Sequence, residues 1–173
     1  MQSHLLTAAA FAFSAAFAIG APALSADLPQ QGSFSTHSAG TYSAQTFQVG
    51  DKHVIAAGNS SQVIYNDADS GPLHRGSIVC TWWFDDVNGS YNTSGACAVG
   101  EAGGTDTIFL EYSGKGTDNV AEQGTGTLTG GTGKYDAVQG KVAYQCKIID
   151  QAQRLFDCTG KWDYQLKAAS AAR

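Results

Sequence analysis

Positive charge is scarce in this chain of 173 residues, which has 10 Lys and Arg against 15 Asp and Glu. Nucleic-acid binding needs clustered basic residues that neutralise phosphates, and here they are scattered at a net charge of −5. The same scarcity argues against an anionic membrane surface as a partner. Proline is also rare, with 3 in the chain, and no segment shows a convincing 3.6-residue apolar period. We therefore expect neither a helical protein nor a nucleic-acid-binding one.

Formal charge is missing altogether from residues 1–26. The run Leu5–Ile19 is apolar, and small residues up to Ala26 follow it. This order is typical of a secretory signal peptide, and we expect cleavage after Ala26, with Ala23 as the alternative site. An uncleaved membrane anchor is the other interpretation. The Ala-rich composition of the segment favours a bacterial source, so we expect a periplasmic or secreted protein. After removal of the signal peptide we expect no contact with the membrane.

The remaining sequence predicts a flexible arm at 27–40, a β-domain at 41–166 and a disordered tail at 167–173. Short alternating segments follow one another, separated by turn signals such as Gly58-Asn59 and Asn88-Gly89. Many short strands at regular spacing indicate a sandwich or a barrel. The candidate strands are Tyr42–Val49, His53–Ala57, Gln62–Tyr65, Ser77–Phe84, Tyr91–Val99, Thr107–Tyr112, Gly124–Thr129, Val142–Ile149 and Arg154–Leu166.

The four cysteines form no C-x-x-C pair, which disfavours a metal site. An even number of cysteines in an exported chain favours disulfides. A two-residue turn at Asn88-Gly89 places Cys80 directly opposite Cys97. Cys146 and Cys158 are likewise placed symmetrically about the polar connection at residues 150–153. We therefore predict two disulfides, each within one hairpin. Both lie on aromatic-rich faces, which we assign to the interior of a barrel. On the first of these faces we expect Trp82 to lie across Gly95.

Glycine is concentrated in residues 124–140, which hold six of them. The segment contains Gly-Gly-Thr-Gly at 130–133, then Tyr135, and then Gly140 at the start of an alternating strand. Consecutive glycines let a strand bend at a barrel corner, and Tyr135 can plug the barrel end. This pattern resembles the allene oxide cyclase and dirigent-type barrel proteins.

The resemblance implies a single small antiparallel barrel of about eight strands, related in shape to the lipocalins. It implies no catalytic residues, because no motif of this chain aligns with those of the cyclases. A phosphate loop does not fit, because Tyr135 follows Lys134 where Ser or Thr is needed. No G-x-S-x-G elbow occurs, and the acidic stretch 67–71 departs from a calcium loop. We predict no metal and no cofactor.

Three functions fit an exported barrel: binding of a small apolar or aromatic ligand, a filled structural or interaction module, and a cyclase-like or dirigent-like isomerase. We rank them in that order, and so expect binding rather than catalysis. The acid Glu111 is the weak catalytic candidate, and it faces outward if Tyr112 faces inward. The loop residues His74 and Arg75 are candidates for a pocket rim. The pocket candidates are Trp82, Phe84, Tyr112, Tyr144 and Trp162.

Overall fold

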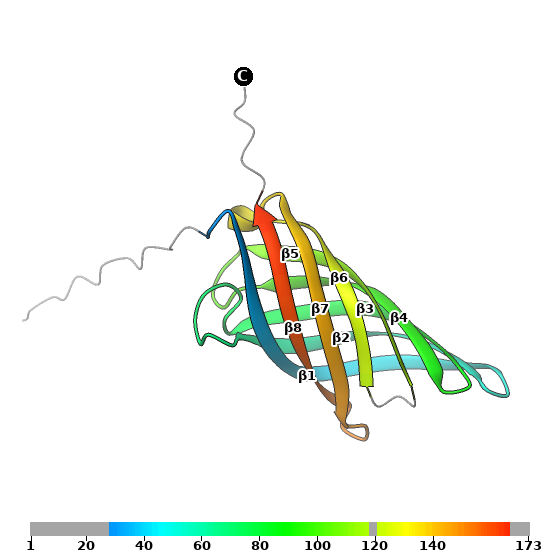
Figure 1. Ribbon diagram of the computed structural model, residues 1–173. Coiled ribbons are helices and arrows are strands. Elements are labelled where there is room, and N and C mark those ends of the chain that lie inside the picture. Colours follow the sequence, from blue (N-terminus) through cyan, green and yellow to red (C-terminus); the bar gives the residue numbers. More distant parts are fainter. Residues whose placement is uncertain (1–27, 118–120, 167–173) are drawn as a thin grey trace, which may run out of the picture.

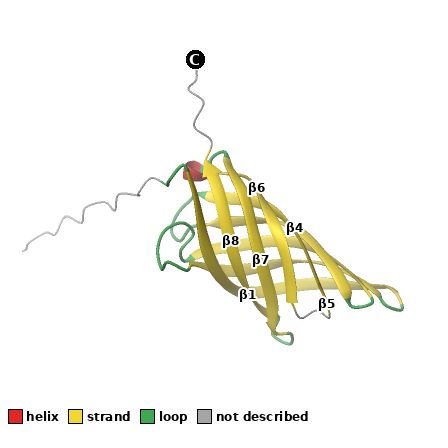
Figure 2. Ribbon diagram, viewed as in Figure 1, coloured by secondary structure: helices red, strands yellow, loops and turns green. Residues whose placement is uncertain are grey.

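The computed structural model describes residues 28–117 and 121–166, most of which lie in β-strands (Figure 1; Figure 2). Within these ranges, eight strands form a closed antiparallel barrel, with one short 3-10 helix, η1. The predicted all-β barrel is confirmed. The elements are β1 (Gln31–Gly50), β2 (His53–Asn66), β3 (Gly76–Val87), β4 (Ser90–Gly100), β5 (Thr107–Thr117), β6 (Ala121–Gly131), η1 (Gly133–Tyr135), β7 (Val138–Asp150) and β8 (Leu155–Leu166).

Each strand pairs with its neighbours in the sequence, and β1 pairs with β8 to close the barrel. The closing seam runs from Gln31 opposite Gln165 to Thr41 opposite Leu155. Because adjacent strands are antiparallel, the connections alternate between the two ends. The β1–β2, β3–β4 and β7–β8 turns lie at what we call the hairpin end. The β2–β3 loop, the β4–β5 loop and η1 lie at the other, the η1 end (Figure 1).

Side chains along each strand alternate between the barrel interior and solvent, as a pleated strand requires. On β6, Gly126 and Leu128 are buried, while Thr125, Thr127 and Thr129 are exposed. The outer face of this strand is therefore polar and its inner face small or apolar. The same alternation assigns the inward residues of the other strands.

Both predicted disulfides are confirmed, and all four cysteines face the interior. Cys80 lies opposite Cys97 across β3 and β4, and Cys146 lies opposite Cys158 across β7 and β8. The dipeptide Asn88-Gly89 forms the β3–β4 turn with φ angles of 58° and 80°. A two-residue hairpin of this kind needs positive φ at both central positions, which Asn and Gly tolerate.

The first strand begins earlier than predicted. From Gln31 onward, the segment expected to be part of a flexible arm at 27–40 forms the first half of β1 and pairs with β8. Its inward residue Phe34 stacks on Trp162, with ring centroids 5.8 Å apart. The polar composition was misleading because the outward positions of a barrel strand are solvated and can all be polar.

The predicted turn at Gly58-Asn59 is also wrong, because both residues lie inside the continuous strand β2. Gly58 has a packing role instead: a Cβ there would lie 2.6 Å from the Trp82 ring. Because the Trp82 ring lies against Gly58, the prediction that it covers Gly95 is wrong. The two residues are opposite in register, but Tyr112 covers Gly95. Inward glycines thus accommodate the aromatic rings of adjacent strands.

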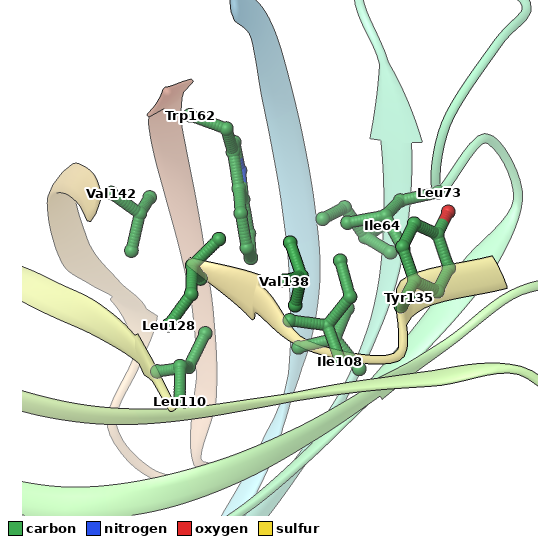
Figure 3. Close-up of a cluster of buried hydrophobic side chains, with 10 residues drawn as sticks. Ile64, Leu73, Ile108, Leu110, Leu128, Tyr135, Val138, Val142 and Trp162 are labelled. Carbon is green, nitrogen blue, oxygen red and sulfur yellow. The ribbon is translucent and has the colours of Figure 1, made fainter. Parts of the chain in front are cut away.

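Apolar side chains fill the interior at the η1 end (Figure 3). Leu73 reaches in from the β2–β3 loop and Tyr135 from η1, and they are 0% and 2% exposed. Together they close this end, as the glycine segment predicted for Tyr135. Ten buried residues form this core: Ile64, Leu73, Val99, Ile108, Leu110, Leu128, Tyr135, Val138, Val142 and Trp162.

Glu101 holds this closure together. Its carboxylate accepts hydrogen bonds from the Tyr135 hydroxyl and from the Leu73 N–H, and it lies 2.5 Å from Lys134 Nζ. Burial acts to raise the pKa of Glu101, but the hydrogen bonds and the charge of Lys134 outweigh it and leave that pKa below its usual value. One carboxylate therefore joins the β2–β3 loop, the β4–β5 loop and η1.

The predicted signal peptide at 1–26 and the predicted tail at 167–173 lie outside the described residues. In the part of the chain that the structure describes, no helix has the length and apolarity needed to cross a bilayer. Cleavage and location therefore stay predictions.

Candidate functional site

The barrel interior is hollow between the core and the hairpin end. A cavity of about 440 Å³ occupies this space. Core residues such as Leu110 and Val142 border it at its inner end, and it extends to Thr46 and Gln151 near the β1–β2 and β7–β8 turns. An eight-stranded barrel has room for one small ligand where side chains leave space. The volume lies within the usual range of small-molecule sites.

The five aromatic residues predicted as pocket candidates all border this cavity. They come from four strands, because the barrel brings inward positions of distant segments together. They are Trp82 and Phe84 of β3, Tyr112 of β5, Tyr144 of β7 and Trp162 of β8.

Further aromatic rings complete the cavity wall. The Tyr42 ring meets Trp82 and Phe156 edge-on, at centroid distances of 6.3 and 6.2 Å. Phe84 lies against Tyr91 at 4.8 Å. Such edge-on and tilted pairs are favourable aromatic geometries. The rings therefore support one another and form a preorganised surface.

Polar groups on the wall formed by β1, β2 and β8 are bonded to one another. Trp162 Nε1 donates a hydrogen bond to Thr36 Oγ1 at 3.0 Å. Ser38 Oγ donates to Gln62 Oε1 at 2.8 Å. Buried polar groups paired in this way need no partner from a ligand. This side of the cavity therefore presents mainly apolar surface.

Glu111, the weak catalytic candidate, lies on the outer face of β5. It is exposed, whereas Leu110 and Tyr112 on either side of it face inward. Of the two arrangements that the sequence allows, the structure has the one with the carboxylate outside the barrel. Glu111 therefore does not reach a ligand in the cavity.

The predicted rim position of His74 and Arg75 is corrected by the structure. Both residues lie in the β2–β3 loop at the η1 end, and neither borders the cavity. The His74 ring instead meets Tyr65 edge-on at 5.9 Å. A sequence does not tell which loops surround a mouth until the strand number and pairing are known.

The acid inside the cavity is Glu122, which the sequence analysis missed. It takes an inward position on β6, borders the cavity and accepts a 2.5 Å hydrogen bond from the Tyr144 hydroxyl. The predicted strand began at Gly124, two residues after it. Extending the alternation of Gly124, Gly126 and Leu128 backwards by one step would have placed this carboxylate inside.

Three tyrosines surround Glu122 and stay protonated well above neutral pH. Burial, together with the Glu122 charge and the Asp86 charge, raises the pKa of Tyr91 to about 12. Burial and the Glu122 charge also raise the pKa of Tyr112 and that of Tyr144. These phenols are therefore hydrogen-bond donors rather than bases. In the pair of Glu122 and Tyr144, the hydroxyl donates its one proton to the carboxylate, so that donor is used within the pair.

Among the described residues, no group of three or more His, Cys, Asp or Glu is arranged to hold a metal ion. Asp67, in the acidic stretch compared with a calcium loop, pairs with His37 at 2.7 Å. It is therefore engaged on the barrel's outer surface.

Comparison with known proteins gives no relative from which a role could be transferred. No protein-family model matches the chain. No curated protein and no solved structure matches it significantly. The barrel and its cavity thus stand on this chain's own sequence and structure.

Proposed function

We propose that this protein binds one small apolar or aromatic molecule inside the barrel, at the hairpin end. The observation that carries the proposal is the cavity of about 440 Å³ and its aromatic lining. Transfer of an apolar ligand from water to such a wall gains roughly 25 cal/mol per Å² of buried apolar surface. In a structural barrel without a ligand, side chains would be expected to fill this space.

Three tryptophans make the test specific. Trp82 and Trp162 border the cavity, whereas Trp83 is 46% exposed on the outer face of β3. Titration of the oxidised protein with the neutral probe N-phenyl-1-naphthylamine should give saturable binding near one to one, with energy transfer from tryptophan. Trp82→Phe should weaken the transfer, and the matched variant Trp83→Phe should leave the binding curve unchanged.

A flat titration of the folded, disulfide-intact protein would contradict the proposal. Equal responses from the Trp82→Phe and Trp83→Phe variants would place the probe on the outer surface instead. Circular dichroism of each variant establishes that the barrel is intact.

A cyclase-like or dirigent-like isomerase is the second candidate. The hydrogen-bonded pair of Glu122 and Tyr144 inside the cavity favours it, because an acceptor and a donor at one place can move protons on a substrate. The resemblance of residues 128–142 to allene oxide cyclase and dirigent-type barrels points the same way. An allene oxide generated in the presence of the protein tests this candidate. An excess of one cyclopentenone enantiomer, lost in Glu122→Gln, supports it, and a racemic product removes it.

We also propose that the protein works in the periplasm or outside the cell. The two disulfides support this, since such bonds persist in oxidising compartments. Fractionation of a bacterial host that expresses the full chain, with mass measurement of the mature N-terminus, tests location and cleavage together. An uncleaved chain that stays in the cytoplasm would contradict this proposal.

A further inference from the structure

The cavity contains a negative charge without a matching positive one. Glu122 borders the cavity, and among the described residues no Lys, Arg or His forms an ion pair with it. Lys147 also borders the cavity but takes an outward position on β7, where its Nζ lies 3.6 Å from Asp157 Oδ2. The Tyr144 hydroxyl donates a hydrogen bond to this carboxylate, but it is neutral and does not balance the charge.

Glycines on β5 and β6 leave the space that the Glu122–Tyr144 pair occupies. A Cβ at Gly114 would overlap both the Glu122 carboxylate and the Tyr144 hydroxyl. A Cβ at Gly124 would touch the same hydroxyl. The backbone of β5 and β6 thus provides a recess for the Glu122–Tyr144 pair.

Thr93 lies beside this recess. It borders the cavity and is opposite Gly114 in the β4–β5 register. Its Oγ1 is buried next to the Tyr144 hydroxyl, and a hydrogen bond between the two side chains acts to lower the pKa of Tyr144 against the larger effect of burial. Thr93 therefore helps to hold the Tyr144 hydroxyl beside Glu122.

Aromatic rings surround the same recess. Tyr112 and Tyr144 meet edge-on at 5.8 Å, and Tyr91 lies with Phe84 on the adjoining wall. The negative faces of such rings attract an organic cation, and the attraction grows when water is excluded. A carboxylate and several rings around one space form a recognition site for a positive charge on an apolar body.

We propose that the ligand of this cavity is an organic amine, bound as its ammonium ion, a proposal that rests on the ligand-binding function above. The ammonium group lies against the Glu122 carboxylate, and the apolar body extends toward Trp82. A charge-assisted N–H bond to a carboxylate is stronger than a bond between neutral groups, which favours an amine over an alcohol. A carboxylate ligand is repelled by the Glu122 charge, because Lys147, the cation that borders the cavity among the described residues, pairs with Asp157.

Three probes with one ring and different head groups test the inference. Phenethylamine, 2-phenylethanol and phenylacetate are titrated at pH 7 into the full oxidised protein, by calorimetry. We expect the amine to bind at least about tenfold more tightly than the alcohol, a difference of about 1.4 kcal/mol, and phenylacetate to bind most weakly.

A matched pair of variants distinguishes the effect on binding of the charge inside the cavity from the effect of the protein's net charge. Glu122→Gln keeps the shape of the side chain and should reduce the advantage of the amine over the alcohol to within about twofold, with the alcohol affinity unchanged. Glu111→Gln removes the same charge from the outer face of the adjacent strand and should leave the tenfold preference intact.

The outcomes distinguish the two proposals. Equal affinities for amine and alcohol, or an amine preference that survives in Glu122→Gln, would overturn the inference and leave the binding function standing. No binding of N-phenyl-1-naphthylamine or of any of the three probes would overturn both.

Discussion

At the η1 end, ten buried side chains pack together, Tyr135 and Leu73 among them, whereas the hairpin end surrounds a cavity of about 440 Å³. The η1 end is held by apolar contact and by the three loops that Glu101 joins. The hairpin end lacks such a core, and both disulfides border its cavity. The Cys146–Cys158 link lies near the β7–β8 turn, whereas Cys97 of the other disulfide also packs against the core of the η1 end.

This difference suggests a division of roles within one small barrel. A filled half can stabilise the closed sheet, because buried apolar area is the main favourable term in folding. A hollow half forgoes part of that term and can accept a ligand instead. Changes in the core of the η1 end should therefore alter stability and spare binding, while changes that fill the cavity should alter binding and spare stability.

The largest effect is expected from removing the closure of the η1 end. Tyr135→Ala should lower the free energy of unfolding by about 3–5 kcal/mol, because it empties a fully buried aromatic site. Urea denaturation measures this change, and probe binding by the folded protein should stay within about twofold. Tyr135→Phe, which loses only the bond to Glu101, is the control and should cost about 1–2 kcal/mol. Equal costs for both variants would show that the hydrogen bond, not packing, closes the end.

Removing a disulfide from the cavity wall is the next largest change. Replacing Cys80 and Cys97 by Ser should destabilise the protein by about 3 kcal/mol, from the chain entropy of a 17-residue separation. Replacing Cys146 and Cys158, separated by 12 residues, should cost slightly less. Thermal unfolding of each double variant measures the cost. A shift of less than 2 °C would mean that the hairpin end is stable without its covalent links.

Alkaline pH should weaken the hairpin end through Tyr91, whose hydroxyl donates to the Ala121 carbonyl at 2.8 Å. Its pKa is raised from 10.0 to about 12 in the folded state. The stabilisation is complete below pH 10 and is lost between pH 10 and 12, because the unfolded chain ionises first. At pH 11 the wild type should have lost about 1 kcal/mol more than Tyr91→Phe, each relative to pH 8. Parallel losses in both proteins, measured by urea unfolding, would contradict this assignment.

The smallest effect on stability, with a large effect on binding, is expected from filling the cavity. Ala56 is buried on β2 and borders the cavity. Ala56→Leu adds apolar atoms to empty space and should change the free energy of unfolding by less than about 1 kcal/mol. Binding of the neutral probe should fall at least about tenfold, because the added volume occupies the site. Ala96→Leu, on the exposed face of β4, is the matched control and should bind normally.

Several local features could be predicted because they depend on neighbours in the sequence. Asn88-Gly89 requires a two-residue turn, and that turn alone pairs Cys80 with Cys97. The glycine segment before Val138 indicated a barrel corner with Tyr135 as its plug. These predictions hold because turn geometry and side-chain alternation act over a few residues.

Other features misled the sequence analysis because they depend on distant strands. The segment from Gln31 is polar and forms a strand only because β8 and β2 pair with it. Gly58 resembles a turn residue until the Trp82 ring from β3 is seen to occupy its empty side. No local pattern carries this information, since the partner that decides each case lies on another strand.

The sequence by itself determined most of the strands, the turn at Asn88-Gly89, both disulfides and the aromatic residues that face inward. Alternation and tight-turn chemistry are local, so each can be worked out from a few neighbouring residues. The tertiary structure alone decided that the first strand begins at Gln31, that a cavity remains toward the hairpin end, and that His74 lies at the opposite end from it. Closing eight strands into one barrel sets which inward positions meet and how much space remains between them, and that depends on all the strands at once.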